Sequence, residues 1–254
     1  MAGGSLTSLN LLGRWDEAIA RADELRALNS ESEEGFSAFE LMIEIGVRVE
    51  RGEIELAREL IEGSQHFEKS EDVQVRAGYF VQTATVLRGE SDHRAALAHA
   101  HTALEAQGHL GWAHPVVKHA FIEATLAARA LGDFDELGAL VGAVKAASPG
   151  EMTAYLEAQA TRAAAALPEA PWEANLKRAA GLFRELNTSF WLAVTLLDQA
   201  EQLVAHDRSQ DAVPHLDEAA SIFERLGAKP WLDRLEQVRS RRPDVLRASA
   251  RASS

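Results

Sequence analysis

The sequence of 254 residues contains no cysteine, which excludes disulfide bonds and thiolate chemistry. A chain without thiols is typical of a reducing compartment, so a cytoplasmic location is expected. No run of eighteen or more apolar residues occurs, and we therefore expect no membrane-spanning helix. The N-terminus lacks the basic and apolar regions of a secretory signal, and residues 1–5 are expected to be a disordered or foreign extension.

Proline is scarce, with seven residues, and β-branched residues are few beside alanine and leucine, so helix is favoured almost everywhere. The formal net charge of −13 opposes binding to nucleic acid or to an anionic membrane. Residues 229–254 differ, because seven Lys/Arg against three Asp/Glu give them a local charge of +4. We expect residues 243–254 to form a basic, disordered tail, and a tail that docks on an acidic surface is the alternative.

Helical periodicity, read against glycine and proline breaks, predicts a succession of helix pairs. Ser148, Pro149 and Glu151 have the spacing of a capping box at the start of one helix, and all seven prolines fall at or near a break or a helix start. No strand pattern is found. The predicted helices cover 14–28, 33–50, 53–67, 71–88, 92–106, 114–131, 133–147, the stretch from 148 to 167, 172–187, 188–206, 210–226 and a last helix from Pro230.

Small residues recur at a fixed period along the chain. Alanines stand 39 residues apart just inside second helices, and a second series of small residues lies inside first helices: Ala18, Ala57, Ala96 and Ala212, then Gly46, Ala84, Ala127 and Ala200. Small side chains let two helices approach closely, and a large substitute should overpack the junction. A repeat of two helices predicts an all-α solenoid of about five pairs, in which neighbouring units share one core over residues 6–242.

The repeated turns resemble a known family. The chain reads Gly-Arg-Trp-Asp-Glu-Ala at 13–18 and Gly-Asp-Phe-Asp-Glu-Leu at 132–137, which looks like the turn of the tetratricopeptide repeat. The units exceed that family's 34 residues and resemble the C-terminal arrays of large bacterial regulatory ATPases, transcriptional activators and cyclase-fused ATPases. Residues 182–236 are similar to the end of such arrays. The resemblance implies a right-handed superhelix, with first helices inside and second helices outside.

That resemblance implies a non-enzymatic scaffold or sensor that binds a protein or peptide segment in its concave groove. The family's groove positions, transferred to this chain, are Ile43, Val47, Val81, Thr85, Arg88, Phe121, Ala128 and Glu201. This apolar lining would accept an amphipathic helix, or an apolar small-molecule effector held in a closed centre. The alternative is that these residues only pack against the next unit. A homodimer through an uncapped array end is also possible.

No catalytic, phosphate-binding or cofactor motif is found, so no enzyme and no cofactor are predicted. Six histidines lie close in sequence: His93, His99, His101, His109, His114 and His119. Neither His99 and His101 nor His114 and His119 share a helix face, and only the loop between helices could bring His109 and His114 together, so no metal site is expected. His119 and Glu123 share a face and are interpreted as a surface pair. Three aromatic residues near turns are assigned to the core, Trp15, Phe134 and Trp172, whereas Phe190 and Trp191 cannot both face it.

Overall fold

The computed structural model describes residues 2–29, 38–148 and 150–241, and all regular elements in this part of the chain are helical. The predicted all-α class is confirmed. The elements are α1 (Ala2–Leu11), α2 (Trp15–Asn29), α3 (Ala38–Arg51), α4 (Ile54–Gly63), the 3₁₀ helix η1 (Gln65–Lys69), α5 (Val73–Gly89), α6 (His93–Leu104), α7 (Gln107–Leu110), α8 (Pro115–Leu131), α9 (Phe134–Lys145), α10 (Ala154–Ala164), α11 (Trp172–Glu185), α12 (Ser189–Ala205), α13 (Ser209–Leu226) and α14 (Lys229–Ser240).

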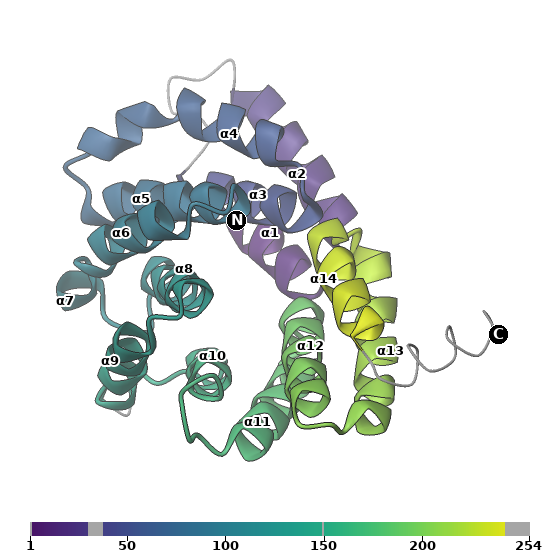
Figure 1. The fold of residues 1–254 in the computed structure, drawn as a ribbon. Coiled ribbons are helices and arrows are strands. Elements are labelled where there is room, and N and C mark those ends of the chain that lie inside the picture. The colour runs from purple at the N-terminus through teal and green to yellow at the C-terminus, as the bar shows by residue number, and fades with distance from the viewer. Residues whose placement is uncertain (1, 30–37, 149, 242–254) are drawn as a thin grey trace.

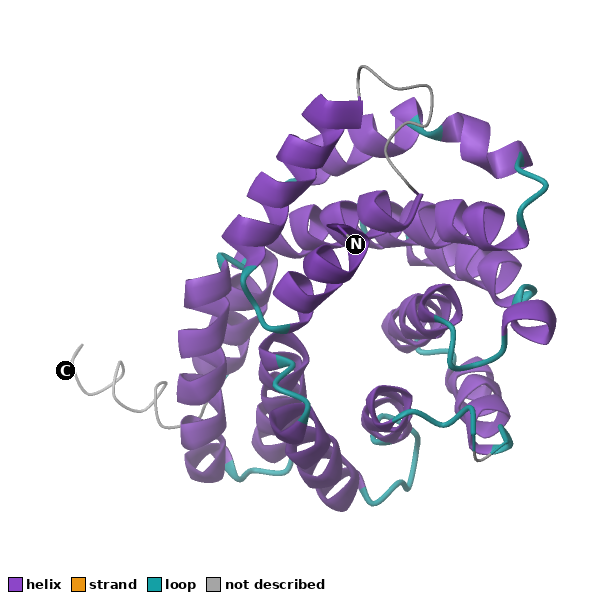
Figure 2. Ribbon diagram, turned by 180° about the vertical axis from the view of Figure 1, so that it is seen from behind, coloured by secondary structure: helices purple, strands orange, loops and turns teal. Residues whose placement is uncertain are grey.

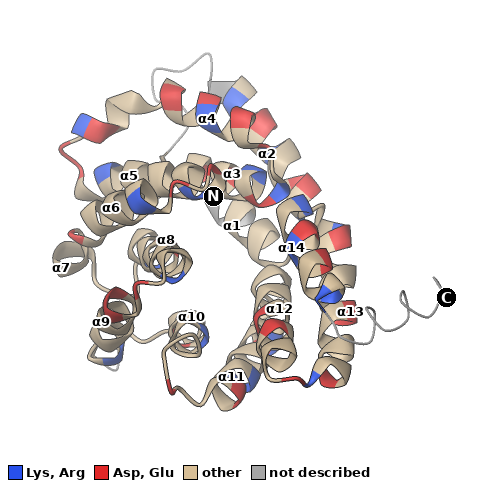
Figure 3. Ribbon diagram, viewed as in Figure 1, with Lys and Arg blue, Asp and Glu red and all other residues tan. Residues whose placement is uncertain are grey.

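The helices follow one another around a common centre (Figure 1). The first helices of successive pairs, α1, α3, α5, α8, α10 and α12, all contribute side chains to a cavity at that centre. Helices α2, α4, α9, α11 and α13 lie farther out (Figures 1 and 2). Both basic and acidic residues lie on the outer helices α2, α4, α13 and α14 (Figure 3). The first helices of the pairs therefore lie inside, and most of the second helices lie outside.

The two ends of the array meet and close it into a ring (Figure 1). The rings of Trp15 and Phe190 lie 5.1 Å apart, which joins α2 to α12. Arg51, at the end of α3, donates from Nε to the carbonyl oxygen of Leu226 over 3.1 Å. We call this junction between α1–α3 and α12–α14 the seam. It brings together segments that are about 180 residues apart in sequence, which an open array would leave separate.

Glycine allows one close approach at the seam. Gly13 has a φ of +71°, and a Cβ atom built on it would lie 2.4 Å from Oγ of Ser189 and 3.0 Å from a methyl group of Leu226. Any larger residue would therefore be strained in its backbone and would also push the two ends of the array apart.

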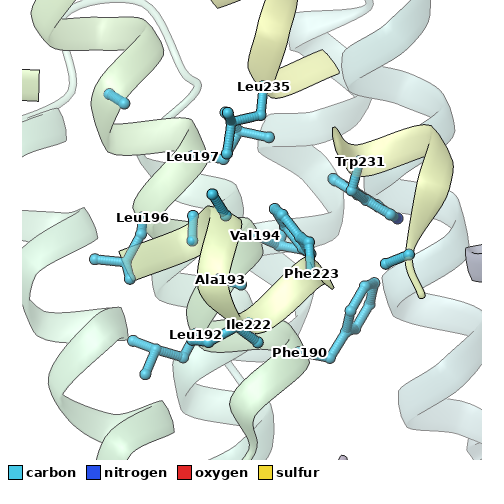
Figure 4. Packing of buried hydrophobic residues seen from close by; sticks show 14 of the residues in the cluster. Phe190, Leu192, Ala193, Val194, Leu196, Leu197, Ile222, Phe223, Trp231 and Leu235 are labelled. Carbon is cyan, nitrogen blue, oxygen red and sulfur yellow. The ribbon is translucent and has the colours of Figure 1, made fainter. Parts of the chain in front are cut away.

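The largest buried apolar cluster spans the seam. It is centred on α12, α13 and α14 and includes Phe190, Phe223 and Trp231 (Figure 4), and it extends to Trp15 and Val47 of the N-terminal units. The four alanines of the 39-residue series are buried, with at most 1% of their surface exposed: Ala18, Ala57, Ala96 and Ala212. The period of small residues therefore marks real helix contacts.

Local structure departs from the sequence predictions at several places. The N-cap of α10 is Thr153, whose hydroxyl accepts from the N–H of Leu156, so the predicted start at Ser148 is wrong. Glu151 does accept from the N–H of Ser148, but its other oxygen accepts from the N–H of Trp112. The turn before α10 is therefore held by the preceding unit as well as by local capping.

Proline, helix length and the chain ends also differ from expectation. Pro214 lies inside α13 rather than at a break. The predicted helix 53–67 ends at Gly63 and continues as η1, and the predicted helix 92–106 ends at Leu104. Residues 2–5 belong to α1, although a disordered extension was expected there. Positions 33–37 of one predicted helix and the basic tail, 243–254, lie outside the described residues.

Two residues, Phe134 and Gly46, lie in surroundings that differ from those predicted for them. Phe134 is 42% exposed, so its assignment to the core is wrong, whereas Trp15 is buried and Trp172 is half-buried. Gly46 was predicted to permit close helix packing, but a Cβ atom built on it meets nothing within 4 Å. Gly46 instead borders the central cavity.

Within the described ranges, no helix is long and apolar enough to cross a membrane.

Candidate ligand-binding cavity

The centre of the ring contains a cavity that is lined by both ends of the array. Its volume is about 670 Å³ when its solvent-filled mouth is included, and about 60 Å³ of it can hold the centre of a water molecule. The lining residues are Asn10, Leu11, Trp15, Met42, Ile43, Gly46, Val47, Glu50, Thr85, His119, Ile122, Glu123, Tyr155, Thr188, Phe190 and Trp191. They come from six inner helices, from α2 and from the N-cap of α12.

Aromatic side chains form the wall beside the seam. Trp15 packs against Phe190, and Phe190 in turn packs edge-on against Trp191 with ring centroids 5.0 Å apart. The indole N–H of Trp15 donates to the carbonyl oxygen of Asn10 over 3.3 Å, which fixes the ring against α1. Phe190 and Trp191 were predicted not to face the core together; Phe190 is buried, and partly buried Trp191 packs against two core clusters. The three rings therefore present flat apolar surface to the cavity, and the indole N–H of Trp15 is engaged by α1.

A buried guanidinium joins two carboxylates of the cavity wall. Arg88 of α5 donates from Nε to Glu123 over 2.7 Å and from Nη2 to Glu50 over 2.6 Å. Glu123 also accepts from the hydroxyl of Thr85 over 2.9 Å, and Glu50 accepts from the indole N–H of Trp231 over 2.6 Å. The four bonds tie α3, α5, α8 and α14 together. They also leave each buried carboxylate with partners of opposite charge or with N–H and O–H donors, as burial requires.

His119 and Tyr155 supply uncharged polar groups to the cavity. Burial lowers the pKa of His119 to about 4, even though Glu123 nearby acts in the opposite direction, so the ring is neutral at pH 7. Burial also raises the pKa of Tyr155 to about 12, which keeps its phenol protonated. The interpretation of His119 and Glu123 as an exposed surface pair is therefore wrong, because both border the cavity and Glu123 is buried.

The structure brings only some of the predicted groove positions to this cavity. Ile43, Val47 and Thr85 line it, and Arg88 contacts two of its carboxylates. Three others lie in core clusters away from it: Val81, Phe121 and Ala128. Glu201 pairs with arginines of α8 and α14.

Several cavity residues were missed by sequence reasoning. Trp15 had been counted only as core, and His119 and Tyr155 had no assigned role in binding. The i, i+4 spacing of His119 and Glu123 was the one available signal, since it places both on one helix face. No group of three or more metal-ligating side chains is found in the part of the chain that the structure describes.

Comparison with known proteins finds no relative from which a function could be inferred. No protein-family model, no curated protein and no solved structure matches this chain. The case for a function therefore depends on the geometry of the cavity and on the chemistry of its walls.

Proposed function

We propose that this chain is a non-enzymatic, tetratricopeptide-like helical ring that binds a small molecule at its centre and serves as a cytoplasmic sensor module of a bacterial regulator. The observation that carries the proposal is the composition of the cavity wall. Trp15 and Glu50 from the first units face Phe190 and Trp191 from the last. A molecule bound between them contacts both ends of the array and stabilises the closed ring. Binding in this way is coupled to the conformation of the whole array.

Size favours a small molecule over a peptide helix. Two turns of an α-helix with side chains occupy about 900 Å³ or more, because such a helix is about 10–12 Å wide. Only about 60 Å³ of the cavity can hold the centre of a water molecule, and the remainder of its 670 Å³ includes open solvent, so such a helix does not fit. Small-molecule sites are mostly apolar and carry a few polar groups, as this cavity does. The closed centre therefore suits the small-molecule effector better than the amphipathic helix.

The wall also suggests the character of the ligand. Trp15, Phe190 and Trp191 offer flat apolar surface, and neutral His119 and Tyr155 offer hydrogen-bonding groups. The two lining carboxylates are already occupied by Arg88, so an anionic ligand would meet like charge without a free cation on the lining. We infer a compact, uncharged molecule with a flat apolar body and one or two hydrogen-bonding groups.

A matched pair of glycine variants tests the proposal. Gly46→Leu places a side chain in the cavity without a steric clash at Cβ, and Gly142→Leu adds the same side chain to the exposed face of α9. A screen of uncharged metabolites by thermal shift should yield compounds that stabilise wild type and Gly142→Leu but leave Gly46→Leu unchanged. At 100 times its dissociation constant, a ligand adds about 2.7 kcal/mol.

The screen has two outcomes that count against the proposal. A compound that stabilises Gly46→Leu as strongly as wild type binds somewhere other than the central cavity. If no compound stabilises the protein and an amphipathic peptide binds saturably, the small-molecule proposal is wrong and binding of a protein segment is favoured.

A further inference from the structure

A second group of buried charges lies between α8, α10, α12 and α14, outside the central cavity. Asp198 of α12 is 2% exposed and receives hydrogen bonds or ion pairs from three arginines. The distances are 2.7 Å from Arg129, 3.0 Å from Arg162 and 2.9 Å from Arg234. Glu201, one turn farther along α12, pairs with Arg129 and Arg234 as well. Figure 3 shows basic segments on α8 and α10 and an acidic segment on α12.

The charges of this group do not balance. Three guanidinium groups face two carboxylates, which leaves a net charge of +1. Both carboxylates are shared by Arg129 and Arg234, whereas Arg162 contacts Asp198 alone. An isolated charge inside a protein is costly unless a counter-charge or several hydrogen bonds accompany it. The surplus positive charge therefore belongs to Arg162.

Arg162 is also the most deeply buried of the three arginines. Its side chain is 3% exposed, against 25% for Arg129 and 32% for Arg234. Its Nε donates to Oε1 of Gln159 over a long 3.4 Å, and its Nη1 donates to Asp198 over 3.0 Å. The amide nitrogen of Gln159, itself 1% exposed, lacks a partner within the described ranges. One buried donor beside Arg162 thus lacks an acceptor.

A small cavity adjoins Arg162 and Asp198. It is lined by Arg129, Arg162, Leu176, Asp198 and Gln202 together with the two alanines that follow α10, Ala165 and Ala166. About 10 Å³ of it can hold the centre of a water molecule, which is the space of one such sphere. A polyatomic anion such as phosphate or sulfate is too large for this space, and its double charge would exceed the surplus of +1.

We propose that this cavity binds a single monovalent anion of the size of chloride. The anion accepts hydrogen bonds from Arg162 and neutralises the surplus charge. It thereby stabilises the junction at which Arg234 attaches α14 to α12. The guanidinium of Arg162 also lies over the ring of Trp191, 5.1 Å from its centroid, so the anion supports one wall of the central cavity. The proposal does not depend on what the central cavity binds.

Two substitutions with opposite effects on the local charge test the proposal. Thermal unfolding is followed while sodium chloride replaces sodium gluconate at constant ionic strength, because gluconate is monovalent but too large for the cavity. Chloride at ten times its dissociation constant should raise the Tm of wild type by about 3–6 °C. Arg129→Gln brings the local charge to zero and should abolish the rise, whereas Glu201→Gln brings it to +2 and should enlarge it.

A surface control and a direct measurement complete the test. Arg184→Gln removes an exposed guanidinium that pairs with Glu218 on the outer surface, and it should leave the chloride effect unchanged. Crystals of the wild-type chain grown in sodium bromide should show anomalous scattering beside Arg162, which decides the matter even if a variant does not fold. An equal chloride effect in Arg129→Gln and wild type, or a water molecule without anomalous signal at this position, would overturn the proposal.

Discussion

The hydrogen bond between Trp231 and Glu50 should be a main stabilising contact of the closed ring. The two residues are 181 positions apart, and the indole N–H donates to the carboxylate over 2.6 Å inside the seam. The indole also packs against Phe190 and Phe223, with ring centroids 5.5 and 5.8 Å apart. Trp231→Phe keeps an aromatic ring at this place and removes the N–H donor.

The expected cost follows from the charge of the acceptor. A hydrogen bond to a charged group contributes about 1.5–3 kcal/mol, and removal of the donor leaves one oxygen of a buried carboxylate without that partner. Trp231→Phe should therefore lower the free energy of unfolding by about 1.5–3 kcal/mol. For a chain of this length, each kcal/mol corresponds to about 2–4 °C, so the Tm should fall by about 3–12 °C.

Urea unfolding of a matched variant separates the hydrogen bond from the loss of indole atoms. Trp172→Phe makes the same change at a half-buried indole that is stacked on His206 and donates no hydrogen bond within the described residues, so its cost should stay below about 1 kcal/mol. In a double-mutant cycle, Trp231→Phe and Glu50→Gln should show a coupling energy above about 1 kcal/mol. A cost of Trp231→Phe below about 0.5 kcal/mol, or no coupling, would refute the role of this bond in the seam.

Four further substitutions have defined outcomes. Gly46→Ala should raise the free energy of unfolding by about 0.5–1 kcal/mol in urea melts, because alanine favours helix and the new Cβ meets nothing within 4 Å. The pKa of His119 is about 4 in the folded chain and 6.5 when exposed, so the unfolded chain binds the proton first and stability is lost as the pH falls from 6.5 to 4. Between pH 7 and 4.5, wild type should lose about 2 kcal/mol more than His119→Gln, and equal losses in urea melts would contradict the buried, neutral ring. Asp198→Asn should cost about 3–5 kcal/mol in the same assay because it leaves the buried Arg162 without its carboxylate. Phe134→Ser should change the Tm by less than about 2 °C, since the ring is largely exposed, and a larger fall would show that it packs after all.

The helices could be predicted because their limits are set locally. Gly132 ends α8 with a φ of +71°, and the carboxylate of Asp133 then accepts from the N–H of Glu136 in the first turn of α9. Asp92 caps α6 in the same way. Each of these helix-end patterns involves residues within four positions of one another, so it can be recognised in the sequence alone. The buried alanines show that the period of the units was equally readable.

The closure of the ring could not be predicted from the same signals. Periodicity identifies the inner face of each helix, but the angle between successive units depends on the volumes of all side chains packed between them. The contact of Trp15 with Phe190 and the bond of Trp231 to Glu50 follow from the accumulated angle over the whole array. No pattern near either residue indicates its partner.

The site was predicted in part for the same reason. Ile43, Val47 and Thr85 border the cavity because they lie on the inner faces of α3 and α5. Phe121, placed by the same rule, packs edge-on against Trp112 in the core, because its helix turns that face toward the neighbouring unit. His119 and Glu123 occupy the inner face of α8 instead. A fixed offset from the small residue therefore fails wherever a helix is rotated about its axis.

Native mass spectrometry of the intact chain tests the central claim most directly. The purified protein is mixed with a metabolite extract, and the mass of each bound species is measured for wild type, Gly46→Leu and Gly142→Leu. We predict one small molecule per chain in wild type and in Gly142→Leu, and none in Gly46→Leu, whose new side chain fills the central cavity. Wild type without a bound molecule, or a bound molecule that Gly46→Leu retains, would contradict the account.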